Sequence, residues 1–398
     1  MLTIDDLSDD DLLAIFDFYV FRYQDAYFRE PQLNDDERKR KIESWQSLIH
    51  VCQRWRALVF GSPRQLNLQL FCIPERSARK YPDVWLPIPL LIRGIVSETF
   101  EVSVDNAIAV LKHNDRVCRI DLHCFKTTPK KKIWAAMEVP FPELESLTLS
   151  SGASSYVPVL PDSILGGSAP RLRDLSLSFI PFPALPKLLM SATHLVNLHL
   201  DNIPHSGYIS PDSVATCLSV LTSLETFRLQ FQFHPNPKSR RPFPLIRFVL
   251  PTLTMFWFKG MIKYLEEFMA QIDAPRLSCF STKFFDEIYF DTPELNHFII
   301  RTPTLGAYNE AHLVFRGDGA RVMLRQSHPE PSDNMMVNME IFFQLSGSHL
   351  PTVAQICTLS LRHLLTMENL YIDGDPFSPL VWDYGVNPSE NRFCPPPP

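Results

Sequence analysis

Apolar residues recur at helical spacing near the start of the chain. The first run, which predicts one amphipathic helix, consists of Leu12, Ile15, Phe16, Tyr19, Val20 and Tyr23. Ser8 is placed to cap this helix, because three aspartates follow it in the first turn. A second helical run consists of Trp45, Leu48, Val51, Cys52, Trp55, Leu58 and Val59. The stretch 24–41 between them is polar without an apolar period, which indicates a solvated loop or the start of a charged helix.

The pattern changes after Arg64 to short alternating runs. Leu66, Leu68 and Leu70 alternate with polar residues and predict a half-buried strand, and the apolar run 90–92 predicts another. Helical stretches and proline breaks separate such runs through the rest of the chain. This alternation indicates an α/β fold.

A repeated unit, L-x-x-L-x-L, accounts for most of these strands. It begins at Leu144, Leu172 and Leu195, and variants begin at Leu224, Leu253 and Leu277. The intervals are 28, 23, 29, 29 and 24 residues, which suits a strand followed by a helical or irregular return segment. Degenerate copies are predicted at 117–122 and 295–300, so the clearest repeats span about 115–300, and 367–372 is a candidate for a further copy.

The repeat divides the residues of each strand between two faces. Its leucines face inward and stack on the next repeat, while the central residue of each x-L-x step points to the opposite, concave face. The predicted binding residues on that face are Thr148, Ser176, His199, Arg228 and Trp257, flanked by Ser146, Asp174, Asn197, Thr226 and Met255. The alternative interpretation is that these are ordinary solvated strand residues.

Composition narrows the possible functions. The 35 prolines outnumber the 13 glycines, and neither of the common glycine-rich phosphate-binding motifs is found. Five of the prolines directly precede predicted strands, where they separate the return segment from the strand: Pro142, Pro170, Pro251, Pro275 and Pro293.

Charge and cysteine usage exclude further classes of function. The net charge of −6 lacks the basic excess of a general nucleic-acid binder. The eight cysteines are dispersed without CxxC spacing, and no metal-ligating motif is found. No apolar run is long enough to span a membrane, and the first residues do not resemble a signal peptide. We therefore expect a cytoplasmic or nuclear protein that binds neither membranes nor nucleic acids and uses no metal or cofactor.

Two segments near the N-terminus carry a family resemblance. Residues 7–16, LSDDDLLAIF, resemble the F-box opening L-P-x-E-x-L-x-x-I-F, with serine and aspartate in place of the usual proline and glutamate. Residues 48–58, LIHVCQRWRAL, resemble its closing helix, L-x-x-V-C-r-x-W. Over roughly 3–385 the chain is similar to the F-box proteins with leucine-rich repeats that are abundant in mushroom-forming fungi.

The resemblance implies an architecture. It comprises an all-helical F-box-like domain over 1–63, with an inserted polar loop at about 24–41, and an irregular leucine-rich repeat solenoid with a curved parallel sheet over 64–385. A proline-rich tail, expected to be disordered, occupies 386–398.

The resemblance also implies a function. Such a protein is a non-catalytic substrate-recognition subunit of a Skp-cullin-F-box ubiquitin ligase, and it binds the Skp adaptor, through it a cullin, and a target protein. The implied adaptor contacts, or the core that supports them, are Leu7, Leu12, Ile15, Phe16, Leu48, Val51, Cys52, Trp55 and Leu58. The alternative is a repeat scaffold whose degenerate F-box assembles no ligase. A hydrolase within the α/β region is a third hypothesis.

Overall fold

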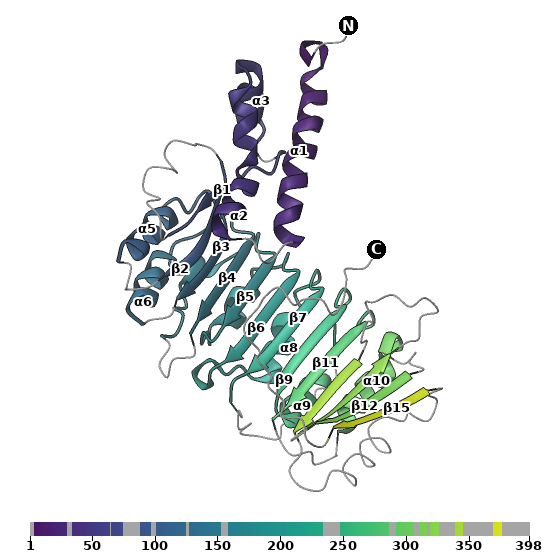
Figure 1. The fold of residues 1–398 in the computed structure, drawn as a ribbon. Coiled ribbons are helices and arrows are strands. Elements are labelled where there is room, and N and C mark those ends of the chain that lie inside the picture. The colour runs from purple at the N-terminus through teal and green to yellow at the C-terminus, as the bar shows by residue number, and fades with distance from the viewer. Residues whose placement is uncertain are drawn as a thin grey trace. The chain divides into compact units, whose positions relative to one another are not determined.

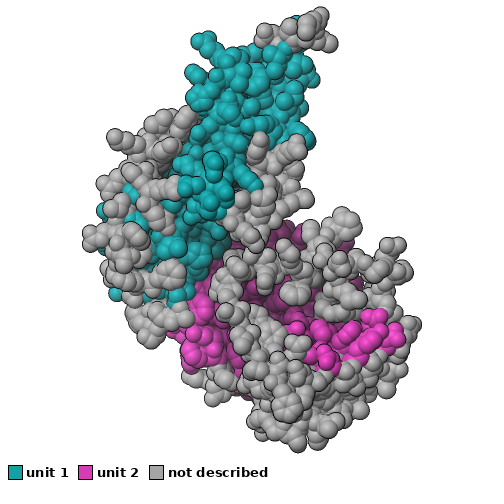
Figure 2. Space-filling model, in the orientation of Figure 1, with its two compact units in different colours: residues 1–172 teal, residues 173–398 magenta. Residues whose placement is uncertain are grey.

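The computed structural model describes residues 4–29, 34–63, 65–74, 88–96, 101–124, 127–152, 158–233, 247–285, 292–305, 310–316, 319–325, 339–344 and 369–375. The chain divides into two compact units, unit 1 over residues 1–172 and unit 2 over residues 173–398 (Figure 2). Both combine helices with strands of a mostly parallel sheet. The predicted α/β class is therefore confirmed.

Unit 1 begins with helices. These are η1 (Ile4–Asp6), α1 (Asp9–Arg29), α2 (Asp35–Ile42), η2 (Ser44–His50) and α3 (Gln53–Gly61). Ser8 caps α1 as predicted, because its Oγ accepts a hydrogen bond from the Asp11 N–H at 3.1 Å. The second predicted helix is divided in two, since Cys52 has extended backbone and caps α3 through its Sγ.

The polar stretch 24–41 is mostly helical, which corrects the inserted loop of the implied architecture and agrees with the alternative interpretation, the start of a charged helix. Helix α1 continues to Arg29, and α2 covers the charged segment from Asp35. Asn34 and Glu37 form a capping box, in which each side chain accepts a hydrogen bond from the other residue's backbone N–H. Local capping therefore starts a helix that the pattern of apolar residues does not predict.

Four parallel strands follow in unit 1. Adjacent in chain order, they are β1 (Leu70–Cys72), β2 (Leu90–Val96), β3 (Val117–Cys124) and β4 (Ser146–Ser151). Helices α5 (Glu101–Leu111) and α6 (Thr127–Ala136) link them, and η4 (Ile164–Gly167) comes after β4. The strand expected from Leu66 starts only at Leu70, because Asn67 adopts a left-handed φ of 47°. Leu66 and Leu68 are buried in the turn before it.

Two side chains join the N-terminal helices to β1. The indole N–H of Trp45 donates to the carbonyl oxygen of Gln69 at 3.0 Å, and the N–H of Phe71 donates to Glu43 Oε1 at 2.9 Å. Burial raises the pKa of the Glu43 carboxyl, with the Lys39 charge opposing this effect. Ile42 packs with Phe71 and other apolar residues of the sheet. The segment from α2 to α3 is thus anchored to the first strand.

Five of the predicted repeats, those that begin at Leu172, Leu195, Leu224, Leu253 and Leu277, form strands of unit 2. Five strands lie parallel and adjacent: β5 (Asp174–Ser178), β6 (Asn197–Ile203), β7 (Thr226–Phe231), β9 (Met255–Gly260) and β11 (Cys279–Phe284). The return segments contain α7 (Leu185–Leu189), η5 (His205–Gly207), α8 (Pro211–Leu218), α9 (Ile262–Met269), α10 (Pro293–Arg301) and η6 (Pro303–Leu305). A separate pair of parallel strands consists of β8 (Phe248–Val249) and β10 (Ile272–Asp273). The sheet and its helices form two layers (Figure 1).

The sheet does not remain parallel to its end. Strand β14 (Met339–Gln344) is parallel to β11, but β13 (Gly319–Arg325) runs antiparallel to both β14 and β12 (Glu310–Arg316). The last strand, β15 (Asn369–Asp375), overlaps the predicted copy at 367–372 and pairs in parallel with β12. The expected repeat strand at 295–300 is wrong, because these residues lie within α10. The predicted tail at 386–398 lies outside the described residues.

The apolar core of unit 2 follows the repeat. Leucines fill most inward positions of β5 and β6, and phenylalanines become the main inward residues from β7 onward, where Leu229 lies between Phe227 and Phe231. The Phe227 and Phe256 rings stack with centroids 5.2 Å apart, and the Phe256 and Phe280 rings follow at 5.8 Å. Four of the five prolines predicted before strands lie in the preceding turns, whereas Pro293 begins α10. The inward face of these strands is therefore buried in the apolar core of unit 2.

Candidate functional site

Helix α1 presents apolar side chains on its outer side. Ile15 and Phe18 are three residues apart, and their exposed fractions are 49% and 65%. Leu12 and Phe16, on the other side of the same helix, are fully buried. We call Ile15 and Phe18 the α1 surface. Because the opposite side of α1 is already packed, these two exposed apolar neighbours make the α1 surface a candidate protein-binding surface.

The structure separates the nine predicted adaptor residues into three groups. Leu12, Phe16 and Leu48 are buried, Leu7, Trp55 and Leu58 are half-buried, and Ile15, Val51 and Cys52 are exposed. Trp55 packs edge-on against Phe16, with ring centroids 4.7 Å apart. Sequence reasoning missed Phe18, although its position three residues after Ile15 on the polar side of the helix was a usable signal.

One arginine fixes α3 against the start of α1. The Arg54 guanidinium donates to the Leu7 carbonyl oxygen at 2.6 Å and to Asp9 Oδ1 at 2.7 Å. These bonds connect residues that are 45 to 47 positions apart in the chain. The two segments that sequence reasoning paired are therefore in direct contact.

The second surface is the sheet face of unit 2 that lies opposite the buried leucines and phenylalanines, which we call the open face. Ser176, His199, Arg228 and Trp257 lie side by side on β5, β6, β7 and β9, in the predicted register. All four side chains are half-buried. Thr148, the fifth predicted residue, belongs to unit 1, where it pairs with Asp121 of β3.

Charged groups on the open face are partly desolvated. Burial, together with the neighbouring Arg228 charge, lowers the pKa of His199 to about 4. Burial raises the pKa of Asp201, while the charges of Arg228 and Lys259 oppose that rise. Arg228 Nη1 lies 3.9 Å from Asp201 Oδ1, and its guanidinium carbon lies 5.1 Å from the centroid of the Trp257 ring. At neutral pH the imidazole is uncharged and the guanidinium is the dominant charge in this row.

An irregularity in β6 positions Asp201. The register of β6 against β7 shifts between Leu200 and Ile203, and Asn202 adopts a left-handed φ of 51°. Directly after β5, Phe179 has a φ of 56°, and its N–H donates to the Asp201 carbonyl oxygen at 3.0 Å. Left-handed backbone is uncommon for a bulky residue, and bulges redirect side chains next to functional sites. Sequence alternation alone does not reveal this feature.

Unit 1 holds a serine, a histidine and an aspartate in line on β4 and β3. The Ser150 hydroxyl hydrogen-bonds to His123 Nδ1, and His123 Nε2 lies 3.7 Å from Asp121 Oδ1. Asp121 also pairs with Arg93 of β2 at 3.4 Å. The parallel pairing of β3 with β4 places Ser150 directly beside His123. The arrangement resembles a hydrolytic triad in residue types, but the 3.7 Å between His123 Nε2 and Asp121 Oδ1 is longer than a hydrogen bond.

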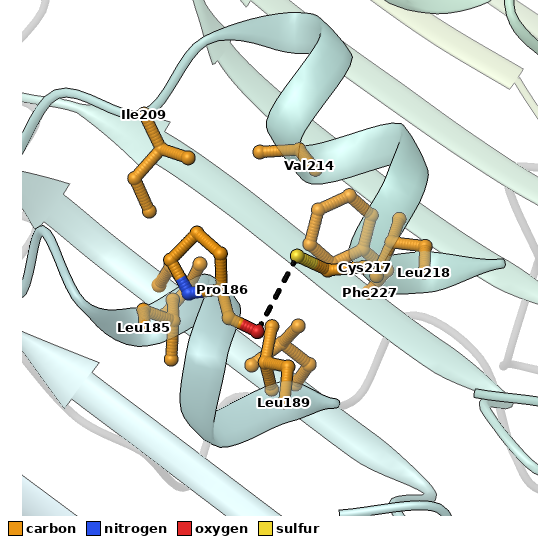
Figure 3. A pocket seen from close by; sticks show the side chains of 10 residues that line it. Leu185, Pro186, Leu189, Ile209, Val214, Cys217, Leu218 and Phe227 are labelled. Atoms are coloured by element: carbon orange, nitrogen blue, oxygen red, sulfur yellow. Dashed lines mark hydrogen bonds between the residues drawn. The ribbon is translucent and has the colours of Figure 1, made fainter. Parts of the chain in front are cut away.

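One cavity of unit 2 lies inside the apolar core (Figure 3). Its volume is about 10 Å³, and it lies between α7, α8 and the inward residues Leu198 and Phe227. The Cys217 thiol there is 3.6 Å from the Pro186 carbonyl oxygen. This gap has room for about one water molecule and no polar lining. It is a packing defect and not a substrate pocket.

The α1 surface and the open face are the candidate sites, and three further findings describe what accompanies them. Within the described ranges, no three histidine, cysteine or acidic side chains are placed to hold a metal ion. None of the helices described combines the length and apolar character that a membrane crossing requires. No known protein-family model matches the chain, and no curated protein matches it in sequence.

The environment of His199 predicts a pH-dependent stability. The imidazole protonates near pH 6.5 in the unfolded chain and near pH 4 in the folded chain. The unfolded state therefore binds more protons between these values, so the free energy of unfolding falls as the pH is lowered from 6.5 towards 4, by up to about 3 kcal/mol. Urea unfolding at pH 7, 5.5 and 4.5 measures this loss.

The matched control is an exposed histidine of the same unit. His199→Gln should show a smaller decrease in stability over this pH range, whereas His297→Gln should behave like the wild type. An unchanged pH dependence in His199→Gln would contradict the assignment.

Proposed function

We propose that this chain is the substrate-recognition subunit of a Skp-cullin-F-box ubiquitin ligase. In this proposal residues 1–63 are the F-box and residues 64–385 are an irregular leucine-rich repeat solenoid. The α1 surface binds the Skp adaptor, and the open face binds a target protein. The proposal requires no cofactor and no catalytic side chain of this chain.

The exposed pair Ile15 and Phe18 carries the proposal. A helix that buries Leu12 and Phe16 against its neighbours while it exposes two large apolar residues is suited to a partner that covers them. Burial of one such side chain contributes about 1.5–3 kcal/mol. Val51, which is 57% exposed, provides a further apolar residue in the segment that resembles the closing helix of the F-box.

The mechanism is catalysis by proximity. The ligase holds a lysine of the target near a ubiquitin-conjugating enzyme, which raises the effective concentration of the reacting groups. The role of this chain is to bind two proteins at once. The register of Ser176, His199, Arg228 and Trp257 supports a recognition role for the repeats, because it places four different side chains on one ordered strand ladder.

Affinity purification tests the adaptor role. The tagged wild-type chain should recover the Skp adaptor and a cullin from cells. The variant Ile15→Glu/Phe18→Glu should recover at least tenfold less adaptor, because it places two charges where apolar contacts are required. Immunoblotting of the eluates measures both proteins.

A matched control uses an exposed aliphatic and an exposed aromatic residue of unit 2. Ile300 and Phe233 are 58% and 53% exposed, so Ile300→Glu/Phe233→Glu introduces the same charges elsewhere. This control should recover the adaptor like the wild type. Absence of adaptor with the wild type, or equal recovery by all three proteins, would favour the alternative of a repeat scaffold with a degenerate F-box.

A further inference from the structure

Two half-buried polar side chains on the open face have no hydrogen-bond partner. His199 and Asp201 lie two residues apart on β6, so both belong to this face. Within the described part of the chain, neither the imidazole nor the carboxylate makes a hydrogen bond, and His199 Nε2 and Asp201 Oδ1 are both shielded from solvent. Buried polar groups are almost always paired, because an unpaired one costs stability. We call His199 and Asp201 the β6 pair.

The neighbouring guanidinium does not satisfy the Asp201 carboxylate. Arg228 Nη1 lies 3.9 Å from Asp201 Oδ1, which is longer than a hydrogen bond. By contrast, Asp174 at the start of β5 accepts a hydrogen bond from Asn197 Nδ2 at 2.6 Å. The same face therefore holds one carboxylate that is satisfied within the chain and one that is not.

The backbone beside Asp201 is irregular as well. The register of β6 shifts after Leu200, and Asn202 has left-handed backbone. Bulges and left-handed backbone outside glycine cost energy, and they are concentrated at binding and catalytic sites. An irregular strand with two unpaired polar side chains is therefore better explained by a ligand than by folding.

Charge alone does not select the ligand of the open face. Among the side chains that the structure describes there, five carboxylates oppose four cations: Asp174, Asp201, Glu310, Glu340 and Asp373 against Arg228, Lys259, Lys283 and Arg321. Next to the β6 pair the signs are mixed, because the charges of Arg228 and Lys259 both act on Asp201. These two cations repel a cationic ligand, and the unpaired carboxylate repels an anionic one. An uncharged ligand avoids both penalties.

The hydrogen-bonding capacity of the β6 pair narrows the ligand further. An ionised carboxylate only accepts hydrogen bonds, so the ligand must donate to Asp201. Burial and the Arg228 charge lower the pKa of His199 to about 4, so at neutral pH the uncharged imidazole has one donor and one acceptor nitrogen. A primary amide also carries both a donor and an acceptor. Residues two apart on a strand are separated by about 6.6 Å, which one amide with a hydrogen bond at each end can span.

We propose that the β6 pair binds a side-chain amide, of asparagine or glutamine, in the target protein. The Asp201 carboxylate accepts a hydrogen bond from the amide nitrogen, and the His199 imidazole donates one to the amide oxygen. Arg228 and Trp257, on the next two strands, are of residue types that often dominate protein interfaces, and they are placed to contact the rest of the segment. This inference rests on the proposed function only in taking the open face as the target-binding surface.

Fluorescence anisotropy with four matched peptides tests this proposal on the purified full-length chain. In the parent peptide, labelled with fluorescein, alanine alternates with glutamine and asparagine. The other three replace glutamine and asparagine by glutamate and aspartate, by methionine and leucine, or by lysine. The amide peptide should bind at least tenfold more tightly than each of the others. No binding of the amide peptide, or equal or tighter binding of any other peptide, would overturn the proposal.

Two single variants remove the hydrogen-bonding groups with little change in side-chain volume. His199→Phe and Asp201→Leu should each weaken binding of the amide peptide at least tenfold, and neither should change binding of the methionine–leucine peptide. His297→Phe alters an exposed histidine on α10 and is the control, which should bind all four peptides like the wild type. Unchanged selectivity in both β6 variants, or an equal loss in the control, would contradict the assignment.

The free energy of unfolding separates a binding role from a structural one. Because the β6 pair makes no hydrogen bond within the described chain, His199→Phe and Asp201→Leu should not lower the free energy of unfolding at pH 7. Asp174→Leu should lower it, since this substitution removes the acceptor of the Asn197 amide. Urea unfolding measures all three variants. Losses in both β6 variants as large as that in Asp174→Leu would show a structural role and overturn the proposal.

This experiment is independent of the adaptor test. His199→Phe and Asp201→Leu should recover the Skp adaptor from cells like the wild type, because both substitutions lie outside the α1 surface. Absence of amide selectivity with normal adaptor recovery would reject only the amide inference. Normal amide selectivity without adaptor recovery would reject the ligase role and leave the binding surface in place.

Discussion

Phe256→Ala should lower the free energy of unfolding of unit 2 by about 3–5 kcal/mol. The Phe256 side chain is fully buried at the centre of an aromatic cluster. Its ring stacks on Phe227 and Phe280 from the adjacent strands and contacts Phe268 of α9, with centroids 5.8 Å apart. Truncation removes contacts with three neighbours and leaves a cavity that a strand held on both sides closes poorly.

Hydrogen exchange shows which strands lose stability in Phe256→Ala. The amides of β7, β9 and β11 should exchange faster in Phe256→Ala, while those of β2 to β4 in unit 1 should change little. Phe233→Ala is the control, because Phe233 is 53% exposed and its truncation should cost no more than about 0.5 kcal/mol. Similar effects of the two substitutions would contradict the aromatic core described for unit 2.

Trp45→Ala should destabilise unit 1 by a comparable amount, about 3–5 kcal/mol. Trp45 is fully buried, and its indole N–H donates to the Gln69 carbonyl oxygen just before β1. The substitution creates a cavity and also leaves that carbonyl without its indole donor. Because the same residue anchors the N-terminal helices to the sheet, the helices and β1 should lose stability together.

Chemical denaturation followed by circular dichroism, with hydrogen exchange of β1 and α3, measures this effect. Phe18→Ala is the matched control, since it truncates an exposed aromatic residue of the same unit and should change stability by no more than about 0.5 kcal/mol. Faster exchange in α3 without any change in β1 would show that the helices are not anchored as described. The control also establishes that the α1 surface is not required for folding.

The repeat strands were predictable because each satisfies two requirements at once. Alternation of leucine with polar residues places one face inward, and the proline or turn before each strand stops the return segment, as at Pro142 and Pro170. Recurrence at a nearly fixed interval then removes the ambiguity of any single short run. The register of His199 against Arg228 follows from the same rule.

The sequence predictions were wrong where one spacing of apolar residues is compatible with both a strand and a helix. Leu295, Phe298 and Ile299 match the repeat, but they also match one side of a helix, and Pro293 is well suited to begin α10.

Two other features had sequence signals that were not used. The helix after Asn34 has no apolar period, but Asn34 and Glu37 have the spacing of a capping box. Gly317-Asp318, between the sequences of the antiparallel strands β12 and β13, is a dipeptide typical of hairpins.

The candidate surfaces were predictable only in part. An apolar period identifies the residues of the N-terminal helices, but it does not distinguish the buried Phe16 from the exposed Ile15, because that depends on where α3 packs. On the open face, strand alternation gave His199 and Arg228. Asp201 lies beside a bulge with left-handed backbone at Asn202. Asparagine favours this conformation, but its presence in a sequence does not by itself locate a bulge.

The most direct test of the proposed function is isothermal titration calorimetry of the purified full-length chain with purified Skp adaptor. The account predicts one adaptor per chain, a negative heat-capacity change from burial of Ile15 and Phe18, and at least tenfold weaker binding by Ile15→Glu/Phe18→Glu than by Ile300→Glu/Phe233→Glu. No binding by the wild type, or the same affinity for both variants, would contradict it.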